Sequence, residues 1–252
     1  MRESSSGEAI KLVKDCLNYL RFHHDLEPAE LSATYPEIFH LTPSHHGVDA
    51  LLRDRTKKLV NEKALDVVRE DHLPTLEDVR KEFEKCHQCR LCKERKNIVF
   101  GVGNEQAKLV FIGEAPGRDE DLKGEPFVGR AGQLLTKIIN AMGLKREDVY
   151  ITNIVKCRPP GNRNPLPDEI AACEPYLMKQ LEVINPRLIC ALGTVAAQIL
   201  LKTDKKISIL RGQFYYYQGI KVLPTFHPAF LLRNPEYKRV VWDDMQLLMK
   251  EY

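Results

Sequence analysis

The cysteines of this 252-residue chain have a spacing that suits an inorganic centre. Cys86 and Cys89 form a CxxC pair, while Cys157 and Cys173 follow far downstream. Two close and two remote thiolates would tie distant segments of the chain together. Four thiolates suit either structural zinc or an iron–sulfur cluster, and the spacing leaves both open.

Three further cysteines are weaker candidates. Cys92 follows Cys89 at the same interval, so residues 86–92 imitate the CxxCxxC run of ferredoxins. Cys190 lies within an apolar run and Cys16 within a helical pattern, so both are predicted to pack as small apolar side chains.

A second group of candidates follows apolar runs. Glu114 comes just after the run 109–112, Asn153 lies at the end of a second run, and His227 follows the run 221–226. In open α/β sheets the ligand lies at the carboxyl ends of the strands, so these side chains are expected at one edge. Phe127, in a loop between Pro126 and Gly129, could stack on a flat ligand.

The charged stretch after Glu114 argues against a phosphate cradle. Residues 118–121, RDED, are predicted to form an acidic loop without the glycine spacing of a P-loop or a dinucleotide fingerprint. Such a loop would repel a pyrophosphate.

The elements that position these residues alternate along the chain. Apolar runs occupy 109–112, 149–155, 188–192 and 221–226, and helical patterns occupy about 130–142, 168–184 and 194–202. This alternation predicts an α/β fold, a three-layer α/β/α sandwich around a mainly parallel sheet of about four strands. The segment 207–219 is predicted to add a hairpin before the last strand.

The chain is predicted to divide near Pro74. Residues 1–73 carry two helical patterns and are predicted to form a helical N-terminal extension, whereas residues 74–252 form the functional domain. Thr75 and Asp78 have the spacing of a capping box, which would open a short helix leading to Cys86.

Composition limits the classes of protein. A hydrophobic fraction of 43% supports a core, and a net charge of +3 only weakly favours a polyanionic partner. No stretch approaches eighteen apolar residues, and the segment MRESSSGEAI lacks an apolar signal core. We therefore expect a cytoplasmic protein that does not bind membranes and has no disulfides.

Four motifs together resemble one family. They are GEAPGRDED, PFVGRAGQLL, TNIVKCRPP and FHPAFLLRNP, in this order between about Cys86 and Met249. They are similar to those of the family 4 uracil-DNA glycosylases, the iron–sulfur branch of the uracil-DNA glycosylase superfamily. The resemblance implies a monomer that flips uracil out of single- or double-stranded DNA and hydrolyses its N-glycosidic bond, leaving an abasic site.

The resemblance also decides the cysteine chemistry. It implies a 4Fe-4S cluster held by Cys86, Cys89, Cys157 and Cys173, with Cys92 as a bystander. The expected role is structural, since the reaction needs no electron.

In this family the polar candidates would recognise the base. The Asn153 amide would pair with uracil O4 and N3–H. It would reject cytosine, which presents the opposite pattern of donor and acceptor at these positions. Phe127 would stack on the flipped base, and a neutral His227 would donate to uracil O2 as negative charge develops.

The carboxylates are expected to act at the sugar. Glu114 is the principal candidate for positioning water or stabilising the sugar cation, with Glu120 as the alternate. Backbone groups of Ala115 and Pro116 are expected to line the uracil pocket.

Two stretches are predicted to contact DNA. In the loop after His227, Leu231 or Leu232 would fill the gap left by the flipped nucleotide, and Arg233 would bind phosphate. A second basic stretch is predicted to bind the strand: Lys156, Arg158 and Arg163. The segment CRPPGNRNPLP has no histidine, so we expect turnover rather than covalent attachment to DNA.

Two alternative functions stay open from the sequence. One is an iron–sulfur protein of the same fold that binds DNA or recognises damage with weak or no catalysis. The other is a zinc-containing nucleotide hydrolase whose acidic loop holds a metal.

Overall fold

The computed structural model describes residues 75–252, so the predicted helical extension at 1–73 lies outside the described residues. The helices are α6 (Leu76–Glu84), η1 (Arg90–Lys93), α7 (Arg118–Lys123), α8 (Arg130–Ala141), η2 (Pro160–Asn162), α9 (Pro167–Ile184), α10 (Thr194–Leu201), α11 (Ile207–Leu210), α12 (Pro228–Arg233), η3 (Pro235–Tyr237) and α13 (Lys238–Glu251). The strands are β1 (Val102–Gly103), β2 (Leu109–Gly113), β3 (Tyr150–Asn153), β4 (Leu188–Leu192), β5 (Tyr215–Tyr217) and β6 (Ile220–Thr225).

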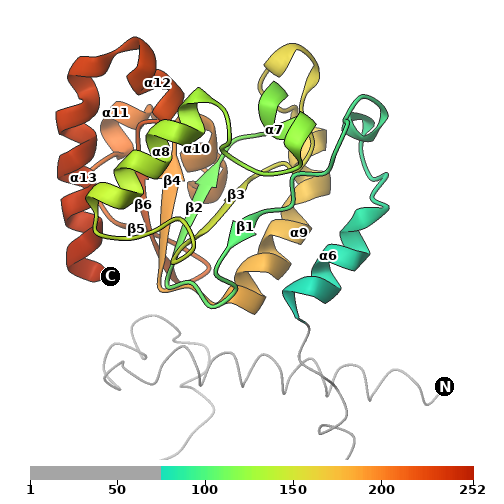
Figure 1. Ribbon diagram of the computed structural model, residues 1–252, viewed down its shortest axis with the longest axis horizontal. Coiled ribbons are helices and arrows are strands. Elements are labelled where there is room, and N and C mark those ends of the chain that lie inside the picture. The colour runs from blue at the N-terminus through green and yellow to red at the C-terminus, as the bar shows by residue number, and fades with distance from the viewer. Residues whose placement is uncertain (1–74) are drawn as a thin grey trace, which may run out of the picture. The chain divides into compact units, whose positions relative to one another are not determined.

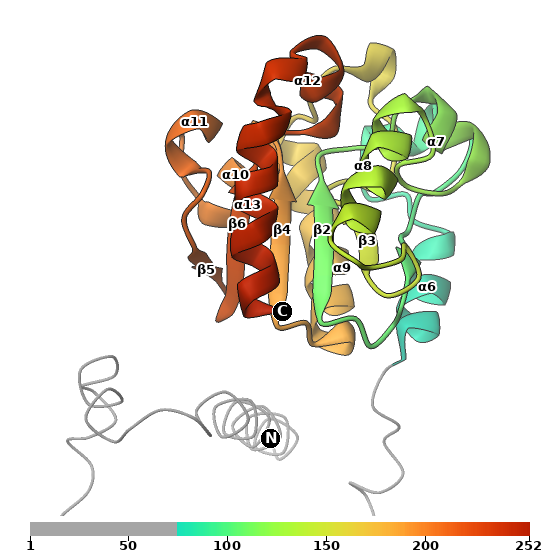
Figure 2. The same ribbon diagram turned by 60° about the vertical axis from the view of Figure 1, so that its left-hand side comes forward.

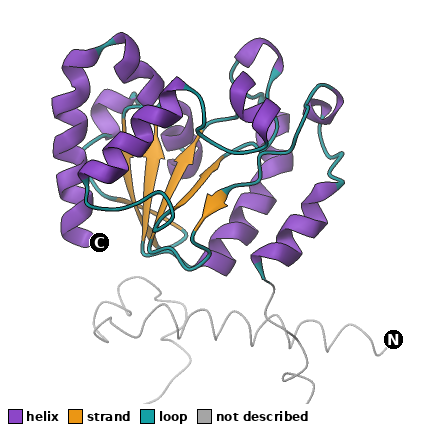
Figure 3. Cartoon of the chain, viewed as in Figure 1, coloured by secondary structure: helices purple, strands orange, loops and turns teal. Residues whose placement is uncertain are grey.

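The strands form one sheet in the order β1-β3-β2-β4-β6-β5 (Figure 3). The four inner strands are parallel and correspond to the four predicted runs, whereas β1 and β5 pair antiparallel at the edges. The mainly parallel sheet is confirmed, although it has six strands rather than about four. No complete hairpin lies within 207–219 as predicted, because residues 207–210 form the helix α11 and β5 pairs with the last strand, β6.

Helices cover both faces of the sheet, as the three-layer prediction requires. Along β2, Val110 and Ile112 pack in the core with α6, α9 and α10, whereas Leu109 and Phe111 pack in the core with α8, α12 and α13. Figures 1 and 2 show α8 and α13 on one side of the sheet and α9 on the other. Burial on both faces explains why the inner strands are continuously apolar.

The order of the strands creates a crevice at the carboxyl end of β2. The connection through α8 leads to β3 on one side of β2, and the connection through α9 leads to β4 on its other side. These two helices pack on opposite faces. Such a reversal is the point at which open α/β sheets bind ligands.

Polar contacts set where the helices on the cysteine side begin. Thr75 and Asp78 form the predicted capping box of α6, with the Asp78 backbone N–H donating to Thr75 Oγ1 at 3.2 Å. At the start of α9, the fully buried Glu169 carboxylate accepts from the Leu166 backbone N–H at 2.8 Å. This contact fixes the helix that carries Cys173.

Two stretches that were predicted to be loops are helical. Residues 118–123 form α7, whose buried Asp121 accepts from the backbone N–H of Lys96 and of Asn97 at 2.9 and 3.3 Å. Residues 228–233 form α12, because Pro228 suits the first helical position and His227 caps the helix. None of the helices in residues 75–252 combines the length and apolar character needed to cross a bilayer.

Candidate active site and cysteine site

Asn153, Phe127 and His227 come together in the crevice at the end of β2. A Cβ atom at Gly113 would lie 2.4 Å from Asn153 Oδ1 and 2.6 Å from Phe127 Cζ, so only glycine leaves room for both side chains. The Phe127 and His227 rings lie 5.6 Å apart between centroids, inclined by 30°. Glu114 follows Gly113 directly in the chain, so its backbone lies at the same strand end.

The amide of Asn153 is buried with an unused acceptor. The residue is 1% exposed, and Asn153 Oδ1 has no hydrogen-bond partner within the described part of the chain. Buried polar atoms in native proteins almost always have a partner. The missing partner is therefore expected to come from a ligand.

Phe127 is held in a backbone conformation that side chains rarely adopt. Its φ is +53°, in the left-handed region. Glu120 fixes the following residues, because its Oε1 accepts from the backbone N–H of Val128 and of Gly129, both at 2.9 Å. Gly132 allows the Phe127 carbonyl to approach, since a Cβ there would lie 1.9 Å from the oxygen. The ring is thus fixed before any ligand arrives.

His227 is set up as a neutral donor. Its Nδ1 accepts from the Ala229 backbone N–H at 3.0 Å, which leaves the proton of the neutral ring on Nε2. Burial, with a smaller effect from the nearby Arg233, lowers the pKa of His227 to about 4, although Glu120 acts in the opposite direction. The imidazole is therefore uncharged near neutral pH.

The two candidate carboxylates differ in how they are bound. Desolvation by burial raises the pKa of Glu114, and no hydrogen bond or ion pair from residues 75–252 reaches its side chain. Glu120 is occupied by the loop after Phe127. Ala115 packs against the core beside α6 and α9, and Pro116 is buried in the same turn. Within residues 75–252, Glu114 thus has both carboxylate oxygens free, whereas one oxygen of Glu120 is engaged.

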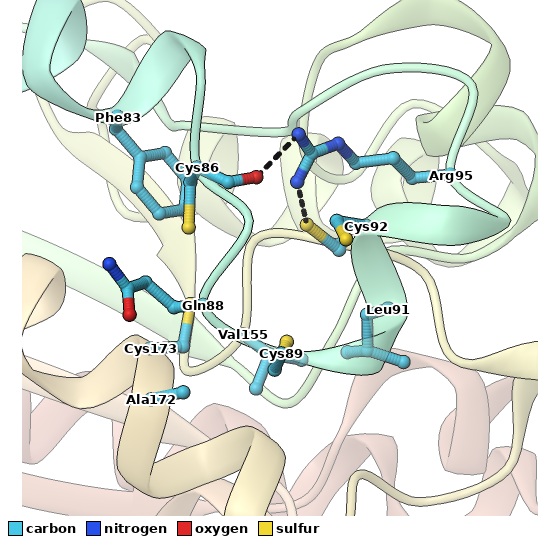
Figure 4. A pocket seen from close by; sticks show the side chains of 11 residues that line it. Phe83, Cys86, Gln88, Cys89, Leu91, Cys92, Arg95, Val155, Ala172 and Cys173 are labelled. Carbon is cyan, nitrogen blue, oxygen red and sulfur yellow. Dashed lines mark hydrogen bonds between the residues drawn. The ribbon is translucent and has the colours of Figure 1, made fainter.

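The cysteine site lies between α6, η1 and the start of α9. Figure 4 shows Cys86, Cys89 and Cys173 around a common space, with Cys92 at its side. The cavity is lined by these four cysteines together with Cys157. The structure therefore brings all four predicted ligands together, and Cys92 with them.

Donors surround the sulfur atoms of this site. Arg95 donates to Cys157 Sγ at 3.2 Å and to the Cys86 carbonyl oxygen at 2.8 Å, and the Lys156 backbone N–H donates to Cys173 Sγ at 3.3 Å. Burial nevertheless raises the pKa of the Cys157 thiol, and that of Cys173 to about 12. A metal centre would be needed to keep such thiols deprotonated.

The spacing of these groups does not suit a single ion. Among residues 75–252, no set of three or more histidine, cysteine or acidic side chains is close enough to hold one metal ion. Two thiolates on one zinc ion lie at most about 4.6 Å apart, because each Zn–S bond is about 2.3 Å long. The described residues therefore form no single-ion site in this structure.

The predicted DNA contacts separate into accessible and inaccessible side chains. Leu231 is 1% exposed in the core, whereas Leu232 is 37% exposed and Arg233 is exposed. Lys156 is fully buried, so its assignment to a phosphate-binding edge was wrong. Arg163 donates through two nitrogens to Glu169, at 2.8 and 2.6 Å.

Arg158, the remaining member of that stretch, donates to Asn162 Oδ1 at 2.7 Å and is half-buried. Of the predicted groups, Leu232 and Arg233 are the best placed to meet DNA.

Sequence reasoning missed two residues that shape these sites. Gly113 was treated only as the end of a strand, although a glycine there can signal a close approach of side chains. Arg95 had no local signal, because its contacts with residues 86 and 157 arise only in the folded chain.

Comparison with known proteins agrees with this fold and site. The family model of the uracil DNA glycosylase superfamily matches residues 100–246. The chain belongs to this superfamily, and within it to the type-4 branch.

Three relatives support the branch, all of them type-4 uracil-DNA glycosylases. The protein of Archaeoglobus fulgidus is 47% identical over 69% of this chain and 92% of its own length. That of Saccharolobus solfataricus is 49% identical over 69% and 85%, and that of Thermotoga maritima is 49% identical over 68% and 91%.

Proposed function

We propose that this protein removes uracil from DNA by hydrolysing the bond between uracil N1 and the deoxyribose C1′. The observation that carries the proposal is the unpartnered Asn153 Oδ1, buried beside the Phe127 ring at the end of β2. The names of its type-4 relatives support the same activity.

Asn153 supplies the recognition of the base. Its Oδ1 accepts from uracil N3–H and its amide nitrogen donates to O4, so uracil satisfies the buried atom that residues 75–252 leave without a partner. Cytosine has an acceptor at N3 and a donor at C4. Cytosine would therefore leave both groups mismatched, which costs much more than losing a weak contact.

Phe127 supplies the surface on which the flipped base stacks. Base–aromatic stacking contributes about 1–3 kcal/mol and offsets part of the cost of leaving the helix. Because the loop already fixes the ring, little conformational entropy is lost on binding.

His227 and Glu114 act on the breaking bond. As the N1–C1′ bond breaks, its electron pair moves onto uracil, and His227 Nε2–H donates to O2 as this charge develops. The half-buried Glu114 carboxylate orients the water that attacks C1′ and accepts its proton. Uracil leaves as an anion and takes up one proton, while Glu114 returns its proton to the solvent, so the products are free uracil and an abasic sugar.

The cysteine site is proposed to hold a 4Fe-4S cluster through Cys86, Cys89, Cys157 and Cys173. When bound, the cluster supplies a covalent crosslink between segments that are distant in the sequence and no electron for the reaction. Cys92 is proposed to be a bystander, because the family pattern does not require it. Arg95 and the Lys156 backbone N–H would stabilise two of the thiolates.

Contact with DNA is proposed to centre on α12. Leu232 would occupy the space of the flipped nucleotide, and Arg233 would bind a neighbouring phosphate. Action as a monomer on single- or double-stranded DNA, and a cytoplasmic location, stay predictions from the sequence.

The proposal is tested with two oligonucleotides that differ at one base. One carries uracil and the other thymine opposite guanine, and each is incubated with iron-loaded protein and then treated with alkali. We expect strand cleavage at uracil together with release of free uracil. DNA binding without cleavage at uracil would instead favour the binding or damage-recognition protein.

A further inference from the structure

Lys156 is a buried lysine that the proposed reaction does not use. Its side chain is fully buried, although an ammonium group loses several kcal/mol of solvation in such a place unless it is compensated. Lys156 Nζ donates to Thr152 Oγ1 at 2.6 Å and to the Asn153 carbonyl oxygen at 2.7 Å. Both acceptors are neutral, so they do not balance the charge.

The negative charge nearest to Lys156 would come from the cysteine site. No ion pair with an aspartate or glutamate is formed by Lys156 within the described part of the chain. The residue precedes Cys157, and its own backbone N–H donates to Cys173 Sγ. Burial lowers the pKa of Lys156 to about 7, and thiolates at positions 157 and 173 would act in the opposite direction.

The acceptors of Lys156 lead directly to the base-reading residue. The ammonium fixes the Asn153 carbonyl, and therefore the peptide from which the Asn153 side chain projects towards Gly113. Thr152 Oγ1 in turn donates to the Phe100 carbonyl at 3.0 Å, which anchors the other acceptor. The Lys156 residue thus contacts the cysteine site through its backbone N–H and the Asn153 peptide through its side chain.

We propose that Lys156 is a positioning residue, which through its hydrogen bonds to Thr152 and to the Asn153 carbonyl holds the Asn153 amide in the orientation that distinguishes uracil from other bases. This inference rests on the proposed function and connects its two sites, because the Lys156 backbone N–H contacts the cysteine site.

The test is Lys156→Met, which keeps the length of the side chain and removes its charge and its donors. The probes are two oligonucleotides of one sequence, with 2′-fluoro-2′-deoxyuridine, whose glycosidic bond resists cleavage, or thymidine at the same position. We expect the preference for the fluorinated uridine to fall about tenfold or more, as for loss of a hydrogen bond to a charged group. Affinity for the thymidine strand should stay within about twofold.

A second readout addresses the cysteine side of the connection. Lys156→Met should release iron to a chelator several-fold faster than the unchanged protein, because the thiolates lose a nearby positive charge. Lys145→Met removes a surface lysine that pairs with Glu147, and should change neither readout. A base preference equal to that of the unchanged protein in iron-loaded Lys156→Met would overturn the inference.

A further pair of variants covers the case in which Lys156→Met does not fold. Thr152→Val removes one acceptor of the ammonium, and Thr152→Ser keeps it. We expect the preference for uracil to weaken about threefold or more in Thr152→Val and to be retained in Thr152→Ser. Equal preferences in both would reject the role of Lys156. An unchanged protein that excises no uracil would instead reject the proposed function.

Discussion

The cysteine site and the base pocket use residues close in sequence, but they differ in whether their acceptor atoms receive hydrogen bonds from the protein. Around the cysteines, Arg95 and the Lys156 backbone N–H already donate to sulfur. In the pocket, Asn153 Oδ1 has no partner and Glu114 accepts no hydrogen bond on its side chain from residues 75–252. Phe127 also has a strained backbone there. The first region is built to be stable, whereas the second keeps its binding capacity for a ligand.

Gln180 shows that an unpartnered buried atom is not by itself evidence of a binding site. It has the other unpartnered buried side-chain atom found in residues 75–252, Gln180 Oε1. Its amide nitrogen is already used in the core, where it donates to the Phe100 carbonyl and to the Tyr150 hydroxyl. An unpartnered atom thus indicates a site only where other functional groups converge on it, as they do at Asn153.

The largest effect is expected from Cys173→Ser. This change removes a buried thiol that is proposed to join α9 to the segment 86–92 through the cluster, so the protein should lose its visible absorption and several kcal/mol of stability. The melting temperature should fall on the order of 10 °C or more. Cys92→Ser is the matched control and should keep the chromophore. Loss of colour in Cys92→Ser would mean that the ligand set is wrong.

The next effect is expected from Glu114→Gln and should appear in the reaction rather than in stability. Single-turnover excision should slow about 100-fold or more, because the amide cannot accept the proton of the attacking water. Stability should change little or increase, since a desolvated carboxylate without a partner is removed. DNA binding should persist.

Two other glutamates provide the comparison for this variant. Glu147→Gln, which removes an exposed ion pair with Lys145, should leave the rate unchanged. Glu120→Gln weakens the two contacts that fix the loop after Phe127. A greater loss of rate in Glu120→Gln than in Glu114→Gln would make Glu120 the reacting carboxylate.

The sequence predicted the parts of the fold that have strong local signals. The inner strands are apolar on both faces, so each produced a continuous run that could be recognised without knowing its neighbours. The two-residue strand β1 was missed, because its pairing is determined by β3 rather than by its own residues. The short helix α12 was also missed, since six residues after a proline show no helical period.

For the site, the sequence predicted which residue types meet but not which side chains face solvent. The motifs placed Asn153, Phe127 and His227 correctly at one crevice. The choice between Leu231 and Leu232 depended on the rotation of α12, which the sequence did not predict. The burial of Lys156 depended on acceptors that only the folded loop brings together.

The smallest effect concerns the pH dependence of stability, and it tests whether the pocket keeps His227 neutral. The pKa of His227 is about 4 in the folded protein and near 6.5 when unfolded. Below pH 6.5 the unfolded chain therefore binds a proton that the folded protein does not. The contribution of neutral His227 to the free energy of unfolding is thus complete above pH 6.5 and is lost as the pH falls towards 4. The loss between pH 7.5 and 5 should be about 2 kcal/mol.

His227→Asn isolates this contribution. The asparagine side chain can still accept from the Ala229 backbone N–H, so the cap of α12 is kept while the titrating group is removed. The carboxylates titrate in both proteins, so their effects on stability cancel when the two proteins are compared. The difference in melting temperature between the unchanged protein and His227→Asn should therefore change by about 4–8 °C from pH 7.5 to pH 5.0, with the unchanged protein losing more. If the melting temperatures of both proteins fall equally, the pKa of His227 is not lowered in the folded protein, and its role as a neutral donor would have to be abandoned.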